Sequence, residues 1–372
     1  MKTYFVTGAT GAIGSALIPV LLRNPETRII LLLRAKSADD LASRLENLFT
    51  FWHINPTDIS TRLRVKPLCG DVTLRRFNLE AADYSALCTD CTHIIHSAGN
   101  VRMNLPIERA RHSSVESAKN IIELARNCPR LEKVEFVSTV GVGGRINGTL
   151  PEEWILIPRD FHNTYEQAKA EAEDTMRAAY ERGLPLTVHR PSMVVGDTKS
   201  GRIIHFQVFY HLCDFLSGCR TLGLAPDFGA ARLDIVPADY VAMVIAWSST
   251  STVSTGRIIH SCSGPEMALP LAPLRDHVRR VFRDAGHRLP PIINLPTELF
   301  KILLAAVSFF MPSEARRAIK TLPVFLDYLA TEQTFANRQT QALITAAGLA
   351  VPPPNSYLDK VLGYYLESAR KY

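Results

Sequence analysis

The chain has 372 residues, of which 47% are hydrophobic and 21% charged, a composition typical of a globular protein with one large domain or two smaller ones. Its net charge of +6 is dispersed and no aromatic-basic motif accompanies it, which excludes a nucleic-acid-binding protein and favours small anionic, phosphate-bearing partners. Seven cysteines spread through apparent strands and helices favour reduced thiols, and the absence of a leader before the first strand predicts a cytoplasmic protein.

Short apolar runs alternate with amphipathic segments through the first 200 residues, which predicts βαβ units and a doubly wound parallel α/β sheet with helices on both faces. The runs are "TYFVTG", "RIILLLR", "LRVKPLCG", "HIIHSAG", "VEFVSTV" and "LTVHRP", and "GRIIHSCSG" at 256–264 is expected to return to the sheet. We predict a nucleotide-binding core of residues 1–196 plus about 230–264. A smaller, mostly helical substrate-binding cap is predicted for about 197–229 plus 265–372.

The stretch "YFVTGATGAIGSALIPVLL" places three glycines between the first strand and the first helix, the context of a dinucleotide-binding turn. Glycine lets the backbone approach a pyrophosphate, and the N–H groups at the helix start receive its charge. The residues expected to do so are Gly8, Thr10, Gly11, Ala12, Ile13 and Gly14. Pro19, inside this helix, is predicted to remove the hydrogen bond to the carbonyl of Ser15.

The second strand ends at "LLLRAKS", where a site for NAD would carry a carboxylate for the ribose hydroxyls. Arg34 and Lys36 stand there instead, and Arg44 follows on the next helix. An arginine pairs with a 2′-phosphate whereas a carboxylate repels it, so the sequence favours NADP.

Two further strand ends suit cofactor contact. "GDV" contributes Asp71 and Val72 near the expected adenine edge, and "SAG" contributes residues small enough to admit the nicotinamide half, Ser97, Ala98 and Gly99.

Two other patterns would suit a metal site and a membrane helix. Cys88, Cys91, His93 and His96 have a spacing that would hold a metal, but the run "HIIHSAG" reads as a buried strand, so we expect no metal site. The apolar run 302–311 has about half the roughly twenty residues that a membrane helix needs, so it predicts a core or lid helix.

The segment "NTYEQAKAEAE" at 163–173 puts Tyr165 and Lys169 four residues apart, on one face of an expected helix. A free phenol titrates at about pH 10, and a neighbouring cation favours its ionised form, so the pair would supply a proton at neutral pH. A solvated pair on a charged helix is the alternative interpretation.

The motifs "TGATGAIG", "GDVT", "HSAG", "FVSTVG", "YEQAK" and "RPSMVVGD" follow the order and spacing of the extended short-chain dehydrogenase/reductases. The chain most resembles their thioester reductase and fatty acyl-CoA reductase branch, through Arg34, the insertion "SADDLASRLENLFTFWHINPTDISTRLRVKP" and "LDIVPADYVA".

The resemblance implies a Rossmann-type fold, bound NADPH and a catalytic triad of Thr139, Tyr165 and Lys169, with Ser138 a weaker candidate for the hydroxyl. It also implies that Pro191 and Met193 line the nicotinamide. An asparagine common in the family's fourth helix is missing, because the chain reads Ser114-Val115-Glu116-Ser117-Ala118 there.

We therefore expect an NADPH-dependent reductase of an acyl thioester, bound to CoA or to an acyl carrier protein, that yields an aldehyde or an alcohol. A ketone or aldehyde reductase, a hydroxysteroid-type dehydrogenase, a sugar-nucleotide epimerase and a non-catalytic NADP(H) sensor remain open. The cluster of Arg316, Arg317 and Lys320 would suit a carrier protein or phosphopantetheine, although a solvated helix face is the more ordinary interpretation.

Overall fold

The computed structural model describes residues 1–296, 298–300, 302–303 and 333–369. Its centre is a seven-stranded parallel sheet of order β3-β2-β1-β4-β5-β7-β12. Every predicted apolar run supplies one strand, so the doubly wound α/β fold is confirmed. The strands are β1 (Lys2–Thr7), β2 (Thr27–Leu33), β3 (Val65–Cys69), β4 (His93–His96), β5 (Lys133–Val137), β7 (Leu186–Pro191) and β12 (Ile258–Ser261).

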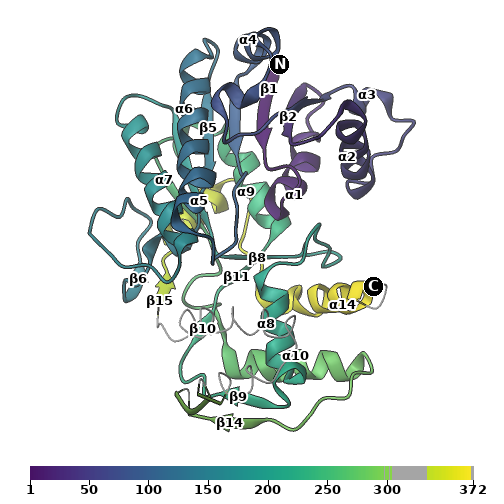
Figure 1. The fold of residues 1–372 in the computed structure, drawn as a ribbon, viewed down its shortest axis with the longest axis vertical. Coiled ribbons are helices and arrows are strands. Elements are labelled where there is room, and N and C mark those ends of the chain that lie inside the picture. Colours follow the sequence, from purple (N-terminus) through teal and green to yellow (C-terminus); the bar gives the residue numbers. More distant parts are fainter. Residues whose placement is uncertain (297, 301, 304–332, 370–372) are drawn as a thin grey trace.

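Helices cover both faces of this sheet (Figure 1). Side chains alternate along the strands, so that Tyr4 and Val6 enter one apolar core while Phe5 enters the other. The first core also receives helices α1 (Ala12–Leu21), α2 (Ala38–Phe51) and α9 (Ala238–Thr250). The second receives helices α4 (Ala81–Asp90), α6 (Ser117–Asn127) and α7 (Thr164–Tyr180). Burial on both faces explains why the strands are nearly continuous apolar runs.

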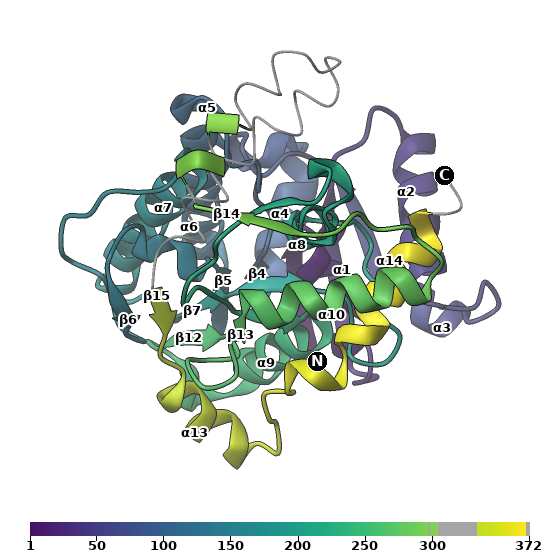
Figure 2. The same ribbon diagram turned by 90° about the horizontal axis from the view of Figure 1, so that it is seen from below.

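Most of the remaining described elements extend from the carboxyl edge of the sheet, whereas α3 (Ile59–Arg62) leads into the amino end of β3 (Figures 1 and 2). The helices are α3 (Ile59–Arg62), α5 (Ile107–Arg111), α8 (Val208–Ser217), α10 (Leu271–Asp284), α13 (Arg338–Ala346) and α14 (Leu358–Ala369). The short strands are β6 (Gly148–Leu150), β8 (Met193–Val195), β9 (Leu224–Pro226), β10 (Arg232–Leu233), β11 (Ile235–Pro237), β13 (Leu269–Pro270), β14 (Ile293–Leu295) and β15 (Gln333–Phe335).

Part of the C-terminal third packs on the core. Strand β15 pairs with β6, and the N–H of Thr340 at α13 donates to the carboxylate of Glu152 at 2.8 Å. Leu358, Val361 and Leu362 of α14 join the apolar core of α1 and α9. These elements belong to the predicted cap, so the cap and the core share an apolar interior.

Two predictions fall on residues that the structure does not describe. The run 302–311 lies outside the described residues, except for Ile302 and Leu303. The basic cluster of Arg316, Arg317 and Lys320 also lies outside them. Among the helices that are described, none has both the length and the apolarity needed to cross a bilayer.

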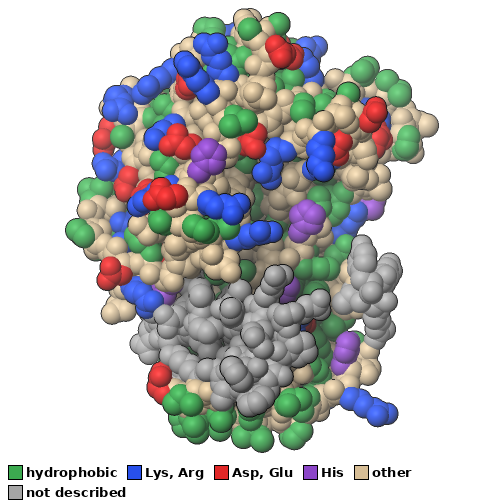
Figure 3. All heavy atoms as spheres, viewed as in Figure 1, with side chains coloured by type: hydrophobic (Ala, Val, Ile, Leu, Met, Phe, Trp, Pro, Cys, Tyr) green, Lys and Arg blue, Asp and Glu red, His purple; other side chains and the backbone are tan. Residues whose placement is uncertain are grey.

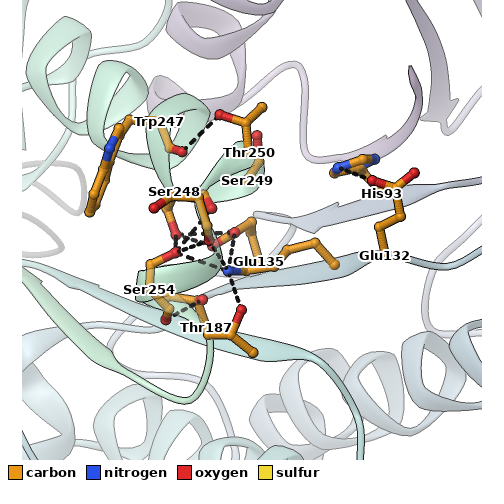
Figure 4. A network of polar contacts seen from close by, with 12 residues as sticks. His93, Glu132, Glu135, Thr187, Trp247, Ser248, Ser249, Thr250 and Ser254 are labelled. Atoms are coloured by element: carbon orange, nitrogen blue, oxygen red, sulfur yellow. Dashed lines mark hydrogen bonds and ion pairs between the residues drawn. The ribbon is translucent and has the colours of Figure 1, made fainter. Parts of the chain in front are cut away.

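A buried polar cluster lies toward the amino ends of β5 and β7 (Figure 4). The carboxylate of Glu135 contacts His189 Nε2 at 2.5 Å and accepts from Ser248 Oγ at 3.0 Å. Lys133 Nζ donates to Ser254 Oγ at 2.9 Å. Most of these polar groups pair with one another inside the protein, although the buried Nδ1 of His189 has no partner among the described residues, so the cluster joins β5 and β7 to the end of α9.

A second buried pair fixes α7 against the sheet. Arg190 at the end of β7 is fully buried, and its Nε donates to Glu173 of α7 at 3.2 Å while a second guanidinium nitrogen meets the other carboxylate oxygen. Glu173 also accepts from Ser138 Oγ at 2.7 Å, and Arg190 donates to His260 Nε2 at 3.3 Å. Helix α7 is thereby held to β5, β7 and β12 at the carboxyl edge.

Glu173→Ala is expected to lower the free energy of unfolding by roughly 3–5 kcal/mol, because it leaves the Arg190 charge buried without its carboxylate. Urea denaturation followed by circular dichroism measures this loss. Glu171→Ala is the control, since Glu171 lies on the same helix but pairs at the surface with Arg111, and it should cost a small fraction of that amount. Equal losses in the two variants would contradict the assignment.

Candidate active site

The glycine turn between β1 and α1 is shaped by close backbone approach. Gly8 has φ +83°, and a Cβ there would lie 2.6 Å from the amide nitrogen of Ala98. A Cβ on Gly14 would lie 2.1 Å from the carbonyl oxygen of Gly8. Helix α1 follows from Gly11 with no side chain capping its first N–H groups. This bare, positive helix start fits the pyrophosphate of a dinucleotide.

The predicted basic residues gather where β2 ends and α2 begins. Arg34 and Lys36 are exposed in the connecting loop. Arg44 Nε donates to Asp40 at 2.9 Å, and the backbone N–H of Lys36 donates to the other oxygen of the same carboxylate at 2.9 Å. The Lys36 amide is the main cause that lowers the Asp40 pKa, and Arg44 adds to it. The Asp40 carboxylate therefore links the loop after β2 to Arg44 of α2.

The residues that follow β3 and β4 differ in which of their polar groups are occupied by local hydrogen bonds. Asp71 Oδ1 accepts from the N–H and hydroxyl of Thr73 at 2.9 and 2.8 Å, so this carboxylate closes a local turn. The carbonyl of Val72 accepts from Asn120 at 2.9 Å. Ser97 Oγ donates to the carbonyl of Thr7 at 2.9 Å, which holds the end of β4 beside the glycine turn.

Tyr165 lies in the first turn of α7, which Asn163 caps by accepting the N–H of Glu166 at 3.0 Å. Its phenol lies close enough to the hydroxyl of Thr139, two residues after β5, for that hydroxyl to lower the Tyr165 pKa. Burial raises the Tyr165 pKa to about 12, against the effect of the Thr139 hydroxyl, and the charge of Glu166 raises it further. The phenol therefore keeps its proton at neutral pH.

The two candidate hydroxyls, which directly follow β5, have different partners. Ser138 is buried and its Oγ donates to Glu173, whereas Thr139 faces the phenol of Tyr165. Thr139 also accepts from the N–H of Gly141 at 3.1 Å, which begins the next turn. The geometry favours Thr139 over Ser138 as the hydroxyl beside the reacting group.

Lys169 lies one turn beyond Tyr165 on α7 and is buried. Its Nζ donates to the carbonyl of Val137 at 3.0 Å, sits 5.4 Å from the ring centroid of Phe136, and would lie 3.3 Å from a Cβ on Gly99. Burial lowers the Lys169 pKa to about 8, against the opposing charge of Glu173.

One electrostatic prediction was wrong. We expected Lys169 to depress the pKa of Tyr165, but the pKa is raised, and Lys169 is not among the causes of the shift. The ammonium points at the Val137 carbonyl rather than at the phenol. The i, i+4 spacing fixed the shared helix face but not the direction of the lysine.

The other predicted nicotinamide contacts come from β7 and β8. Pro191 is the last residue of β7 and is buried, and Met193 begins β8 and is partly exposed. The parallel pairing of β8 with β11 sets Met193 opposite Ile235.

Sequence reasoning missed a pair beside Tyr165. Both the backbone N–H and the ring Nδ1 of His162 lie 3.1 Å from Glu166 Oε2. The buried Glu166 also packs against Gly141, where a Cβ would lie 3.0 Å from its Cγ. The spacing of four residues between His162 and Glu166 was the signal that was available in the sequence.

The chain is similar in sequence to a known family and to several curated proteins. The profile of the male sterility protein family matches residues 6–245. Isonitrile lipopeptide synthase of Streptomyces coeruleorubidus is 29% identical over 242 residues, which cover 64% of this chain and 16% of that protein. L-2-aminoadipate reductase of Schizosaccharomyces pombe is 28% identical over 281 residues, 72% of this chain and 19% of that protein. The chain spans less than a third of the length of the curated relatives it matches.

Solved structures share the fold. The terminal R domain from the myxalamid PKS-NRPS biosynthetic pathway superposes with a TM-score of 0.81 at 24% identity, covering 99% of this chain and 91% of that one. The reductase (R) domain of a nonribosomal peptide synthetase from Mycobacterium tuberculosis gives 0.74 at 21% identity, covering 100% and 92%. The chain belongs to the male sterility protein family, in the thioester reductase branch of the extended short-chain dehydrogenase/reductases, which are NAD(P)-dependent oxidoreductases.

Proposed function

We propose that the chain is an NADPH-dependent reductase of an acyl thioester carried on a carrier protein or on CoA, with an aldehyde or an alcohol as product. The observation that carries the proposal is the approach of the Thr139 hydroxyl to the phenol of Tyr165, with the buried Lys169 one turn away on α7. The names of relatives that act as reductases or peptide synthetases support the substrate class.

The reaction assigns one task to each side chain. The reduced dinucleotide, when bound, supplies the hydride to the carbonyl carbon of the substrate. Tyr165 donates its proton to the oxygen on which negative charge develops, and Thr139 Oγ donates a second hydrogen bond to that oxygen. Lys169 holds the nicotinamide ribose through hydrogen bonds from its ammonium. The hemithioacetal so formed expels the thiol and leaves an aldehyde.

The preference for NADPH is part of the proposal. Arg34, Lys36 and Arg44 surround the loop after β2, where a 2′-phosphate would lie if the pyrophosphate binds at the glycine turn. The guanidinium groups offer charge-assisted hydrogen bonds to this phosphate. Gly8, Thr10, Gly11, Ala12, Ile13 and Gly14 would hold the pyrophosphate, Asp71 and Val72 the adenine, and Ser97, Ala98, Gly99, Pro191 and Met193 the nicotinamide side.

The substrate class is tested by following NADPH absorbance with a panel of acyl-CoAs, carrier-bound acyl groups, aldehydes and ketones. The proposal expects oxidation with thioesters, with one or two NADPH consumed for each thioester. Activity confined to free ketones would overturn it.

Tyr165→Phe is expected to lower kcat by about 10²- to 10⁴-fold, because the variant has no proton to donate to the oxyanion. NADPH affinity should change little, since the phenol acts on the substrate oxygen. Steady-state kinetics and NADPH fluorescence titration measure the two effects. Tyr180→Phe, at the other end of α7, is the matched control and should retain the turnover of the parent. A Tyr165→Phe variant with parental kcat would remove Tyr165 from the chemistry.

The pH dependence follows from Lys169. Its pKa of about 8 keeps the side chain charged below about pH 8 and lets it lose its proton above that value. Because only the charged ammonium is proposed to hold the nicotinamide ribose, kcat/KM is expected to fall about tenfold per pH unit on the alkaline side, while Tyr165 stays protonated. Profiles recorded from about pH 6 to about pH 10 check this. Lys169→Arg should abolish the alkaline limb, and a flat parental profile would contradict the role of Lys169.

Arg34→Ala is expected to raise KM for NADPH by about 10-fold or more, because a charge-assisted hydrogen bond to the 2′-phosphate is lost. KM for NADH should stay within about 2-fold of the parent, because NADH has no phosphate there. Initial rates with both cofactors at one substrate concentration measure the ratio. A parental enzyme that prefers NADH would refute the assignment of NADPH.

A further inference from the structure

The proline inside α1 is compensated from another helix. Pro19 has no N–H, so the carbonyl of Ser15 loses its partner within the helix. The indole Nε1 of Trp52 donates to this carbonyl at 2.7 Å. Trp52 is buried and follows directly on the last residue of α2. The hydrogen bond from Trp52, at the end of α2, therefore replaces the bond to Ser15 that α1 lacks.

Helix α2 is held mainly at its carboxyl end. Among its 14 residues only Leu48 and Phe49 are buried, and both lie in the last turn beside Trp52. The Phe49 ring packs edge-on against Trp52 with centroids 5.9 Å apart. At the same end of α2, the guanidinium carbon of Arg202 lies 4.4 Å from the centroid of the Phe51 ring. The amino-terminal half of α2 also packs on the core through the half-buried Leu41 and Leu45, but its other side chains are largely exposed, so the Trp52 anchor adds the directional part of its attachment.

The exposed end of α2 carries the groups proposed for the 2′-phosphate. Ser37 caps the helix by accepting the N–H of Asp40 at 3.2 Å, and Asp40 in turn joins Arg44 to the Lys36 amide. Arg44 lies eight residues before Trp52, about 12 Å along the helix axis at 1.5 Å per residue. A tilt of about 5° at the anchor would displace Arg44 by about 1 Å, enough to spoil a bidentate contact.

We propose that Trp52 is a positioning residue for 2′-phosphate recognition, which acts by tying α2 to the helix of the glycine turn through the carbonyl that Pro19 leaves open. The proposal rests on the NADPH preference proposed above. It makes the glycine turn and the basic loop one unit, in which the pyrophosphate and the 2′-phosphate positions keep a fixed separation.

A purely structural role is the competing explanation, because an unpaired buried carbonyl is unfavourable wherever it lies. Pro19→Ala separates the two roles. The N–H that this substitution restores satisfies the Ser15 carbonyl within α1 but does nothing to hold α2. Combined with Trp52→Phe, it repairs the lost hydrogen bond of α1 while leaving α2 without its anchor.

The experiment compares Trp52→Phe, the double variant Pro19→Ala/Trp52→Phe, Pro19→Ala and Arg44→Ala with the parent. NADP⁺ and NAD⁺ affinities are measured by calorimetry, unfolding midpoints by urea denaturation, and amide hydrogen exchange over residues 38–51 by mass spectrometry. Trp52→Phe is expected to weaken NADP⁺ binding roughly 3- to 10-fold, to leave NAD⁺ binding within about 2-fold, and to speed exchange in α2. The double variant should recover the unfolding midpoint but keep the weak NADP⁺ binding and the fast exchange.

Two results would overturn the inference. Recovery of NADP⁺ affinity in the double variant would mean that Trp52 only satisfies a carbonyl, and unchanged α2 exchange in Trp52→Phe would mean that it anchors nothing. Arg44→Ala separates this failure from failure of the proposed function. If Arg44→Ala weakens NADP⁺ binding about 10-fold while Trp52→Phe does not, the inference fails and the NADPH assignment stands. If Arg44→Ala changes nothing, both fail.

Discussion

The buried guanidinium of Arg190 sets the geometry on which the site depends. It pairs with Glu173 of α7, and Glu173 also accepts a hydrogen bond from Ser138, the neighbour of Thr139 directly after β5. A buried charge pair of this kind contributes little net stability, but it tolerates few alternative arrangements because removing either partner is costly. The pair therefore fixes α7 in rotation and height against the sheet. That constraint brings the phenol of Tyr165 to the hydroxyl of Thr139.

The same low-dielectric surroundings give the two titrating side chains different tasks. Burial raises the Tyr165 pKa to about 12 and lowers the Lys169 pKa to about 8, so both shifts favour the neutral form. The phenol is therefore suited to give its proton to an oxyanion that is a stronger base than the phenolate. The lysine keeps its charge at neutral pH partly because Glu173 opposes the effect of burial. One carboxylate thus supports both the position of α7 and the charge of its lysine.

The sequence predicted what depends on periodicity and local spacing. Apolar runs of β-strand length gave all seven strands of the sheet, and the glycines between β1 and α1 gave the close approach of Gly8 to Ala98. It did not predict contacts between distant segments. The Trp52 indole meets the Ser15 carbonyl across 37 residues, and Lys133 meets the 251–255 turn across more than 110, because the topology alone brings them together. Lys169 was misjudged because spacing specifies a helix face, whereas the direction of a long side chain depends on the acceptors around it.

The fold does not separate this chain from relatives with other chemistry. A UDP-glucuronic acid 4-epimerase from Bacillus cereus in complex with NAD superposes with a TM-score of 0.66 over 99% of both chains. The two proteins thus share the fold, and a difference in chemistry has to arise from the groups that each carries on it. In this chain these groups are the basic loop after β2 and helix α2, which carries Arg44 and Asp40. The amino-terminal half of this helix packs on the core through the half-buried Leu41 and Leu45, and a directional attachment adds to how firmly it holds its charges. The hydrogen bond from Trp52 to the carbonyl beside Pro19 is such an attachment, since an apolar contact alone would let the helix slide or tilt.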